Sequence, residues 1–244
     1  MSAKKATKKA AGSKPAKPAV TPALEAKELT KKYGDLTALA PLDLSIKVGE
    51  RVALVGANGS GKTTLLRLTA GLLERTEGDV DVMGHRAGTL EARAALSYIP
   101  DDPVLYDDLS VQEHLQYLGP VYGVEDWEER GSKLLERLGI AHRADDLPSG
   151  FSRGLRQKVS LALGFLRPFE VLAVDEPFVG LDEPGRLALL GLLDEASAAG
   201  ATVIVASHQL DLMKTSDRAI ALTDGAVTYD GSPAKVDLTK LVGA

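Results

Sequence analysis

The sequence predicts an α/β fold built around a mostly parallel β-sheet. From Leu24 onward, apolar runs of strand length alternate with stretches of helical length, which is the order of strands and covering helices in such folds. Several runs, among them Val171–Val174 and Thr202–Ala206, are apolar almost throughout, as is typical of strands buried on both faces. Because ligands of these sheets bind outside the carboxyl ends of the strands, the residues that follow each strand are the first candidates for a functional site.

The individual elements follow from these runs and from the helical periodicity between them. Strands are expected at Leu42–Val48, Arg51–Val55, Gly78–Met83, Ala95–Ile99, Val171–Val174, Thr202–Ala206, Ala219–Leu222 and Ala226–Tyr229. Helices are expected at Lys62–Leu72, Val111–Tyr122, Trp127–Leu138, Arg153–Leu166, Glu183–Ala199 and Gln209–Thr215. The stretch Val104–Leu147 is rich in helix and poor in strand, which predicts a helical insert. We find no internal repeat and expect one domain over residues 23–240, with its helical part at about residues 101–155.

Composition restricts the class of protein. The 244 residues are 44% hydrophobic and 26% charged, with no cysteine, which is ordinary for a globular chain and excludes disulfides and thiolate chemistry. The net charge of −5 divides into +6 from six lysines in residues 1–22 and −11 from the remainder. A body this acidic argues against nucleic acid as the main partner.

The first 22 residues are rich in Ala, Lys and Pro and lack a hydrophobic period, which predicts a disordered tail. The alternative is a weak polybasic contact with anionic lipid. No stretch of the sequence approaches the roughly 18 apolar residues that a membrane span requires, and the N-terminus lacks an apolar leader. We therefore expect the chain to be cytosolic. If it works at a membrane, a partner protein must hold it there.

A phosphate-binding loop is predicted where the strand Arg51–Val55 meets Gly56-Ala-Asn-Gly-Ser-Gly-Lys-Thr63, which matches G-x-x-x-x-G-K-[ST] at every fixed position. Glycines let backbone N–H groups turn inward around a phosphate, and the following helix points its positive end at the same place. Lys62 can reach the β- and γ-phosphates, and the Thr63 hydroxyl can bind Mg²⁺. The predicted nucleotide-binding residues are Gly56, Ala57, Asn58, Gly59, Ser60, Gly61, Lys62, Thr63 and Thr64.

Two carboxylates follow the strand Val171–Val174, in the sequence Asp175-Glu176-Pro177. At the end of a buried strand they are unfavourable unless a cation lies beside them. Asp175 is placed to hold Mg²⁺, usually through water, and Glu176 is placed to orient and polarise the attacking water. In isolation this triplet would more often be an ordinary strand end, but beside the phosphate loop it predicts a hydrolysis centre.

His208 follows the strand Thr202–Ala206 at the same edge of the predicted sheet. A single histidine after a strand is usually structural. Here one of its ring nitrogens is placed to donate to a γ-phosphate, so we expect His208 to act in the catalytic site with Glu176.

The segment Phe151-Ser-Arg-Gly-Leu155 resembles the signature of the ABC (ATP-binding cassette) ATPases, whose common form is L-S-G-G-Q. Ser152 and Gly154 match, while the other three positions resemble the variant of exporter subunits. The residues alone indicate that Ser152 caps the helix Arg153–Leu166, whose N-terminus is a second anion site; without the other motifs, a capped helix would be the simpler interpretation. The order of motifs across Leu24–Val236 is similar to that of the ABC family.

This resemblance implies a P-loop NTPase cassette, in which an antiparallel β subdomain and a helical subdomain join the mostly parallel sheet. It implies ATP and Mg²⁺ as cofactors, stacking of Tyr33 on adenine, and a D-loop at Val179–Asp182 that touches a second ABC ATPase subunit. It also implies a homo- or heterodimer in which Ser152 and Gly154 of one copy close over the ATP of the other. By the same resemblance, we expect an integral membrane transporter subunit to dock on the helical insert and to hold the chain at the inner face of the plasma membrane.

One position departs from the family pattern. In Tyr98–Tyr106, Asp101 occupies the place where the family has a glutamine that contacts Mg²⁺ and water. A carboxylate can also bind Mg²⁺, so Asp101 joins Thr63 and Asp175 as a predicted metal ligand, but it adds negative charge beside Asp175 and Glu176.

Two functional classes agree with these motifs. The first is the ATPase subunit of an ABC transporter, more specifically an exporter, because the variant signature and Tyr98–Tyr106 resemble the drug, antibiotic-peptide and Ecs-type exporter groups. The second is a soluble ABC ATPase of a cytosolic machine such as cofactor assembly. Ser152 follows Lys62 by 90 positions, which leaves no room for the long coiled coils of the DNA-repair members, and the chain carries one cassette where translation members carry two.

Overall fold

The computed structural model describes residues 21–208 and 215–237 of the chain. Nearly all of the predicted N-terminal tail, and with it the lysines of the predicted lipid contact, lies outside the described residues. The predicted helix Gln209–Thr215 lies outside them too, except for its last residue. In the described part, no helix is both long enough and apolar enough to span a membrane.

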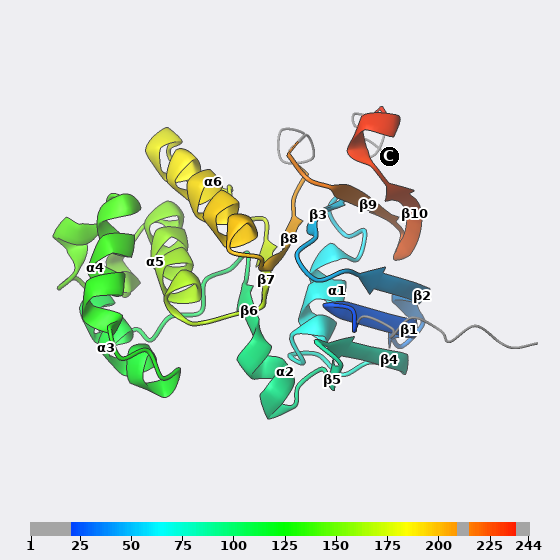
Figure 1. Ribbon diagram of the computed structural model, residues 1–244, viewed down its shortest axis with the longest axis horizontal. Helices are drawn as coiled ribbons and strands as arrows, with labels where there is room; N and C mark the ends of the chain where they lie inside the picture. Colours follow the sequence, from blue (N-terminus) through cyan, green and yellow to red (C-terminus); the bar gives the residue numbers. More distant parts are fainter. Residues whose placement is uncertain (1–20, 209–214, 238–244) are drawn as a thin grey trace, which may run out of the picture.

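A six-stranded sheet forms the centre of the molecule, in the order β10-β9-β3-β8-β7-β6 (Figure 1). Strands β3, β6, β7, β8 and β9 run parallel, and β10 pairs antiparallel with β9 at one edge. The predicted mostly parallel sheet is thus confirmed. The strand bounds are Arg51–Val55 (β3), Leu96–Ile99 (β6), Val171–Asp175 (β7), Thr202–Ala206 (β8), Arg218–Thr223 (β9) and Ala226–Gly231 (β10).

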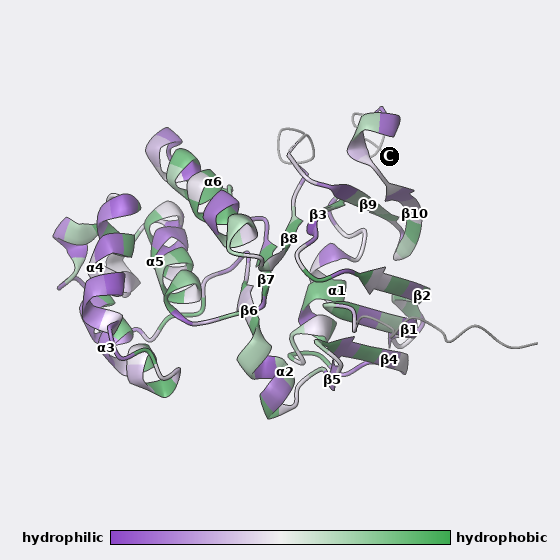
Figure 2. Cartoon of the chain, viewed as in Figure 1, coloured by the Kyte–Doolittle hydropathy of each residue, from purple (hydrophilic) through white to green (hydrophobic). Residues whose placement is uncertain are grey.

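Both faces of this sheet are buried, which explains why its strands are apolar almost throughout. In β7, Val171 and Ala173 belong to one hydrophobic cluster, whereas Leu172 and Val174 belong to another on the opposite face, because successive side chains of a strand point to opposite sides. The first cluster lies toward α1 (Lys62–Thr69) and the second toward α5 (Arg153–Leu166) and α6 (Glu183–Ala198). Figure 2 shows the hydrophobic colouring that runs through these central strands.

A separate four-stranded antiparallel sheet packs beside α1, in the order β2-β1-β4-β5 (Figure 1). Its strands are Leu24–Tyr33 (β1), Leu36–Ile46 (β2), Glu77–Val82 (β4) and His85–Arg86 (β5). Strand β1 was not predicted, because its pairing shifts register after Ala26 and Glu28 adopts a φ of 48°. Such an irregularity interrupts the alternation of apolar and polar side chains from which a strand is predicted.

The helical part lies on the other side of the central sheet, at the left of Figure 1. It contains α3 (Val111–Val121), α4 (Trp127–Arg137) and two short 3₁₀ turns, Ala141–Arg143 and Pro148–Gly150. A capping box between Ser110 and Glu113 fixes the start of α3. Helix α2 (Leu90–Ala95) and a 3₁₀ turn at Pro233–Lys235 complete the described elements.

Most predicted helices match within one residue, but the first is shorter than predicted. Helix α1 ends at Thr69 rather than Leu72, because Gly71 turns into the left-handed region with a φ of 67°. Glycine adopts this conformation without steric cost and commonly ends helices in this way. The predicted strand Leu42–Val48 is likewise the second half of the longer β2.

Candidate functional site

The loop between β3 and α1 surrounds a hollow of about 180 Å³. Gly59 and Gly61 adopt φ values of 83° and 105°, which side chains with a Cβ rarely adopt. These conformations turn the loop around the hollow in front of the first turn of α1. The residues that line it are Ala38, Asn58, Gly59, Ser60, Gly61, Lys62, Thr63, Thr64, Asp101 and Glu176.

Lys62 reaches from the start of α1 into this loop, with only 5% of its side chain exposed. Its ammonium donates to the carbonyl oxygens of Gly56 at 2.8 Å and Ala57 at 3.1 Å, and Nζ lies 3.5 Å from Oε1 of Glu176. A buried ammonium is stable only with such partners. The predicted loop residues and Glu176 are thus brought together in one place.

Asp175 is the last residue of β7 and is fully buried. Neither of its carboxylate oxygens has a hydrogen-bond partner within the described ranges. Burial is the main cause that raises the pKa of Asp175, and the charges of Asp101 and Glu176 raise it further, whereas the nearby Thr63 hydroxyl and Lys62 lower it. A buried carboxyl group whose pKa is raised in this way is one that a cation would stabilise in its charged form.

These oxygens fit a magnesium site, together with the Thr63 hydroxyl. No group of three or more His, Asp or Glu side chains that could hold a metal ion occurs among the residues the structure describes. Mg²⁺ commonly uses one or two protein ligands and completes its shell with substrate phosphates and water. The site would therefore take Mg²⁺ together with a nucleotide rather than alone.

Glu176 adopts a left-handed backbone conformation with a φ of 43°, which is uncommon for a residue with a long side chain. Its N–H donates to the carbonyl oxygen of Ala206 in β8 at 2.8 Å. Nδ1 of His208, which follows β8, lies 2.9 Å from Oε2 of the Glu176 carboxylate. Strained conformations of this kind are concentrated at functional sites, and here the strain accompanies the contact between the two predicted catalytic residues.

Asp101 follows β6 and lines the hollow together with Thr63 and Glu176. Its Oδ1 accepts a hydrogen bond from Nη2 of Arg153 at 2.6 Å. The structure thus places the third predicted metal ligand at the hollow, in an ion pair with the first residue of α5.

Ser152 and Gly154 lie at the N-terminus of α5. The Ser152 hydroxyl accepts a hydrogen bond from the backbone N–H of Leu155, which confirms the predicted cap. A Cβ on Gly154 would lie 2.1 Å from the carbonyl oxygen of Gly180, so only glycine fits there. Across the described residues, neither Ser152 nor Gly154 lines the hollow.

The family of the chain follows from comparison with known proteins. The family model described as ABC transporter matches residues 39–179. The chain belongs to the ABC transporter family. The SkfA peptide export ATP-binding protein SkfE of Bacillus subtilis (strain 168) is 34% identical over 210 residues, which cover 85% of this chain and 88% of the relative.

Solved structures agree with this membership. An ATP-binding subunit of an ABC transporter superposes with a TM-score of 0.80 and 34% identity, over 86% of this chain and 89% of the other. The ATP-binding cassette MJ0796, in a dimeric post-hydrolysis state bound to ADP and Pi, superposes with a TM-score of 0.78 and 26% identity, over 86% and 98%. The predicted ABC fold and the predicted ATPase activity in transport are confirmed.

Tyr33 lies apart from the residues that line the hollow of this ABC subunit. Its side chain is 51% exposed at the end of β1, and the Lys31 ammonium lies 4.6 Å from the ring centroid. The exposed ring is available to a planar base, but the predicted adenine stacking stays a prediction.

Sequence reasoning missed one residue that lines the hollow, Ala38, and one that binds a lining residue, Arg153. Ala38 in β2 lines it, because its carbonyl oxygen approaches Gly61 closely, and no motif marks this residue. Arg153 was noted only as a departure from the signature, although it binds Asp101. A signal for this pair was present in the sequence. Asp101 replaces a neutral glutamine of one motif, and Arg153 replaces a neutral glycine of the L-S-G-G-Q signature, so one acidic and one basic residue are gained together.

Proposed function

We propose that two such ABC subunits, identical or homologous, close head to tail on two magnesium-bound ATP molecules and thereby drive export through an integral membrane partner. The observation that carries this proposal is the separation of Ser152 and Gly154 from the hollow of their own chain. The capped N-terminus of α5 is a favourable place for an anion, and a second subunit can supply the phosphate that it lacks.

Within each subunit, Lys62 binds the β- and γ-phosphates, and Thr63 and Asp175 hold Mg²⁺, with Asp101 beside them. Mg²⁺ supplies charge neutralisation of the phosphates when bound. Glu176 orients and polarises the attacking water, and His208 fixes the Glu176 carboxylate at 2.9 Å and donates toward the terminal phosphate. This assignment is supported by the contact of one carboxylate with both Lys62 and His208.

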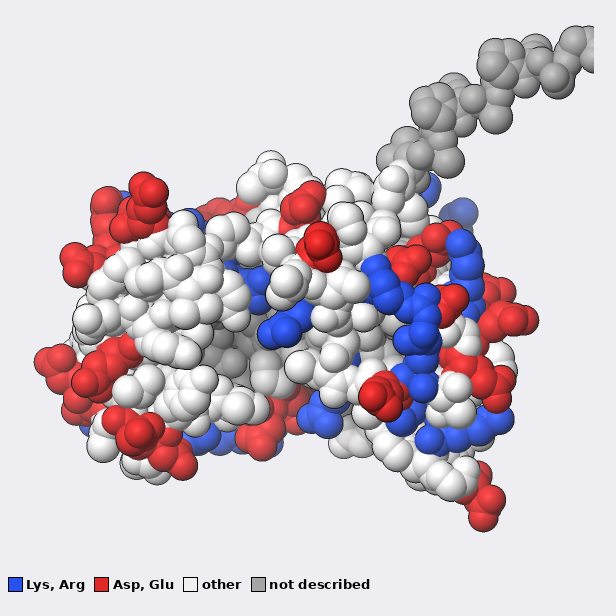
Figure 3. Space-filling model, turned by 90° about the horizontal axis from the view of Figure 1, so that it is seen from below, with Lys and Arg blue, Asp and Glu red and all other residues white. Residues whose placement is uncertain are grey.

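The membrane partner docks in a groove of about 550 Å³ between the two parts of the molecule. Its apolar lining, which includes the 88%-exposed Val104, fits an amphipathic helix that inserts its apolar face. Figure 3 shows a broad uncharged area over the helical part, with Lys and Arg side chains toward the sheets. The groove residues are Arg67, Leu72, Ser97, Tyr98, Pro100, Asp102, Val104, Leu105, Leu118, Tyr122, Ser160, Leu163, Gly164 and Arg167.

Export as the direction of transport is supported by the relative SkfE, which is by name a peptide export ATP-binding protein. The same relationship favours a transporter over the cytosolic machine that the motifs also allowed. The membrane partner selects the cargo. In this proposal the groove of the described residues binds that partner and their hollow binds the nucleotide, so neither site is assigned to cargo.

Co-purification with a multi-span membrane protein tests the proposal. The tagged chain is extracted from membranes in mild detergent, and Val104→Glu is compared with Leu187→Glu, which changes a 60%-exposed leucine on α6 outside the groove. We expect Val104→Glu to lose the membrane partner while both variants bind ATP. A chain that is recovered without any multi-span partner contradicts the transporter, and equal recovery of the partner by both variants contradicts the docking site.

A further inference from the structure

Acidic side chains outnumber basic ones at the nucleotide hollow. Asp101 and Glu176 line it, and Asp175 is buried next to them. Among the described residues of its lining, Lys62 is the only cation, and it already binds two carbonyl groups and Glu176. A nucleotide would add its phosphates to this group, and Mg²⁺ would offset part of the charge, but no side chain of the described lining is left to offset the charge of Asp101.

Arg153 provides a positive charge at that place. Its guanidinium donates to Asp101 at 2.6 Å, and the two side chains are 54% and 41% exposed. The stem of Arg153 lies against Gly180, in the segment that follows β7, with Cγ 3.8 Å from the position of a Cβ there. Arg153 therefore joins three segments, namely those after β6, before α5 and after β7.

A second arginine of α5 shows that this arrangement is built rather than incidental. Arg156, one turn further along the helix, donates to the carbonyl oxygens of Pro103 at 3.2 Å and Pro148 at 3.3 Å. The segment after β6 is thus fastened to the start of α5 at two points, Asp101 and Pro103. This fastening keeps the Arg153 guanidinium at the rim of the hollow.

We propose that Arg153 compensates the charge of Asp101 and so lets the hollow accept magnesium-bound ATP. The ion pair would then serve at position 101 in place of the neutral glutamine of the family pattern. The inference rests on the proposed function, in which this hollow binds ATP and Ser152 and Gly154 act on a second subunit. Arg153 lies between Ser152 and Gly154. The ion pair therefore connects Asp101 in the nucleotide hollow of one subunit to the segment of the same subunit that closes over the nucleotide of its partner. Arg153 is a positioning residue for Asp101 and touches no reacting atom.

The size of the effect follows from the exposure of the pair. Exposed ion pairs are weak and are screened by salt, so the pair contributes little to folding. A carboxylate left without its counter-charge still repels the phosphates of a nucleotide at close range, which we expect to weaken binding about three- to tenfold at low salt. The effect should decrease as salt is added.

The test measures the dissociation constant of a magnesium complex of a non-hydrolysable ATP analogue, with Glu176 unchanged and the protein monomeric by size-exclusion chromatography. Arg153→Gln should bind about three- to tenfold more weakly than the parent. Asp101→Gln removes the unpaired carboxylate together with the ion pair, so it should bind more tightly than Arg153→Gln, and the double variant Asp101→Gln/Arg153→Gln should match Asp101→Gln to within about twofold. Arg153→Lys, which keeps the charge, should bind like the parent.

Lys133→Gln is the matched control, because Lys133 forms an exposed ion pair with Glu129 on α4, away from the hollow. It should leave binding unchanged, and thermal unfolding should confirm that every variant is folded. Equal weakening by Asp101→Gln and Arg153→Gln would show that the pair only maintains shape and would overturn the proposal. An unaffected Arg153→Gln would overturn it too, whereas a parent chain that binds no nucleotide would contradict the proposed function itself.

Discussion

Nδ1 of His208 lies 2.9 Å from Oε2 of Glu176, and the other oxygen of the same carboxylate lies 3.5 Å from Nζ of Lys62. One side chain thus connects the residue after β8 to the phosphate loop after β3. Glu176 is 12% exposed and Lys62 5%, whereas His208 is 49% exposed, so the contact with Lys62 is shielded from water and the contact with His208 lies nearer the surface. The roles of all three residues can be separated by substitution.

Glu176→Gln should bind ATP but hydrolyse it about 10²- to 10⁴-fold more slowly, because the amide cannot accept a proton from water. The stalled variant should accumulate a dimer in the presence of magnesium and ATP. Single-turnover hydrolysis and light scattering after gel filtration measure the two effects. Turnover at the parental rate would show that Glu176 is not the base.

His208→Ala should lower hydrolysis about 10²-fold, as expected when one donor to a developing charge is removed. ATP affinity should change far less than the rate, because Lys62 and the loop still bind the phosphates. The exposed His142, in the 3₁₀ turn Ala141–Arg143, gives the control variant His142→Ala. A loss of activity shared by both variants would contradict a catalytic role for His208.

Lys62→Ala should abolish tight ATP binding, with a loss of affinity of at least about tenfold, equivalent to about 1.4 kcal/mol. The substitution also removes the cation beside Glu176, so thermal unfolding must be compared with that of Lys133→Ala. Equilibrium binding of a fluorescent ATP analogue to the parent and to Lys62→Ala measures this loss of affinity. Unchanged affinity would contradict the assignment of the phosphate site.

Gly154→Ala should destabilise the chain by about 1–3 kcal/mol, since the new Cβ would lie 2.1 Å from the Gly180 carbonyl oxygen. Gly150→Ala is the matched control on the same segment, because a Cβ there meets no atom within 4 Å. Chemical denaturation gives both free energies of unfolding. If the two variants are equally stable, the close contact between the backbones at Gly154 and Gly180 is not maintained in solution.

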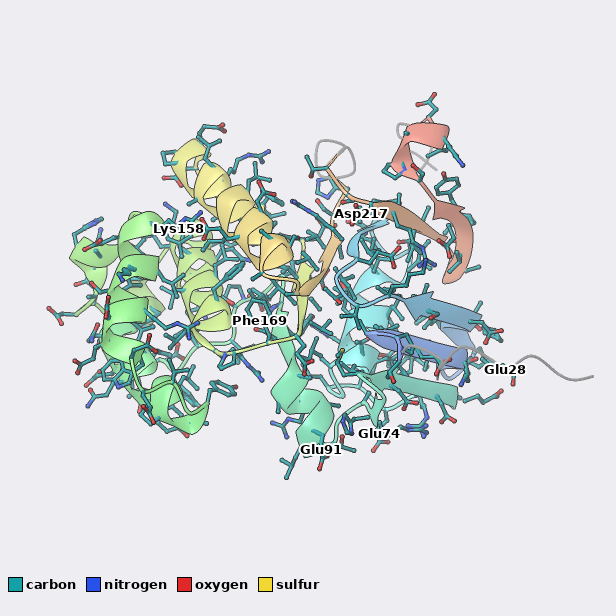
Figure 4. The ribbon with its side chains drawn as sticks, viewed as in Figure 1. Glu28, Glu74, Glu91, Lys158, Phe169 and Asp217 are labelled. Atoms are coloured by element: carbon teal, nitrogen blue, oxygen red, sulfur yellow. The ribbon has the colours of Figure 1, made fainter. Side chains whose placement is uncertain are left out.

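The pair of Lys158 and Asp182 gives a pH-dependent prediction. The buried Lys158 ammonium on α5 (Figure 4) lies 2.8 Å from Oδ1 of Asp182, and this bond is the main cause that lowers the pKa of Asp182. A lowered folded-state pKa stabilises the protein above the unfolded-state pKa, near 4, and the stabilisation is lost as the pH falls through the lower, folded-state value.

Asp182→Asn should therefore lose about 1 kcal/mol of stability at pH 7, a small value because Asp182 is 58% exposed. Its stability should also fall less than that of the parent when the pH is lowered below 4. Urea unfolding at a series of pH values measures both quantities. Parallel pH profiles for the two proteins would contradict the charge contribution.

Prediction from sequence was most accurate where a short segment contains all the information. Strands β3 and β8 and helix α5 were predicted to the residue, because a continuous apolar run or a capped amphipathic helix is visible within a few turns of chain. Strand β1 was missed because the irregular backbone at Glu28 breaks the local pattern. Its pairing with β2 and β4 depends on residues elsewhere in the chain.

The sequence by itself determined the fold class, the phosphate loop, the order of the catalytic motifs and the family, since each is written in a contiguous stretch of residues. Only the tertiary structure decided which of these residues meet. Asp101 and Arg153 are 52 residues apart in the chain and 2.6 Å apart in space, and Glu176 reaches His208 across the edge of the sheet. The physical reason is that the parallel strands bring their carboxyl ends to one edge, and a sequence pattern records the strands but not the contacts made beyond them.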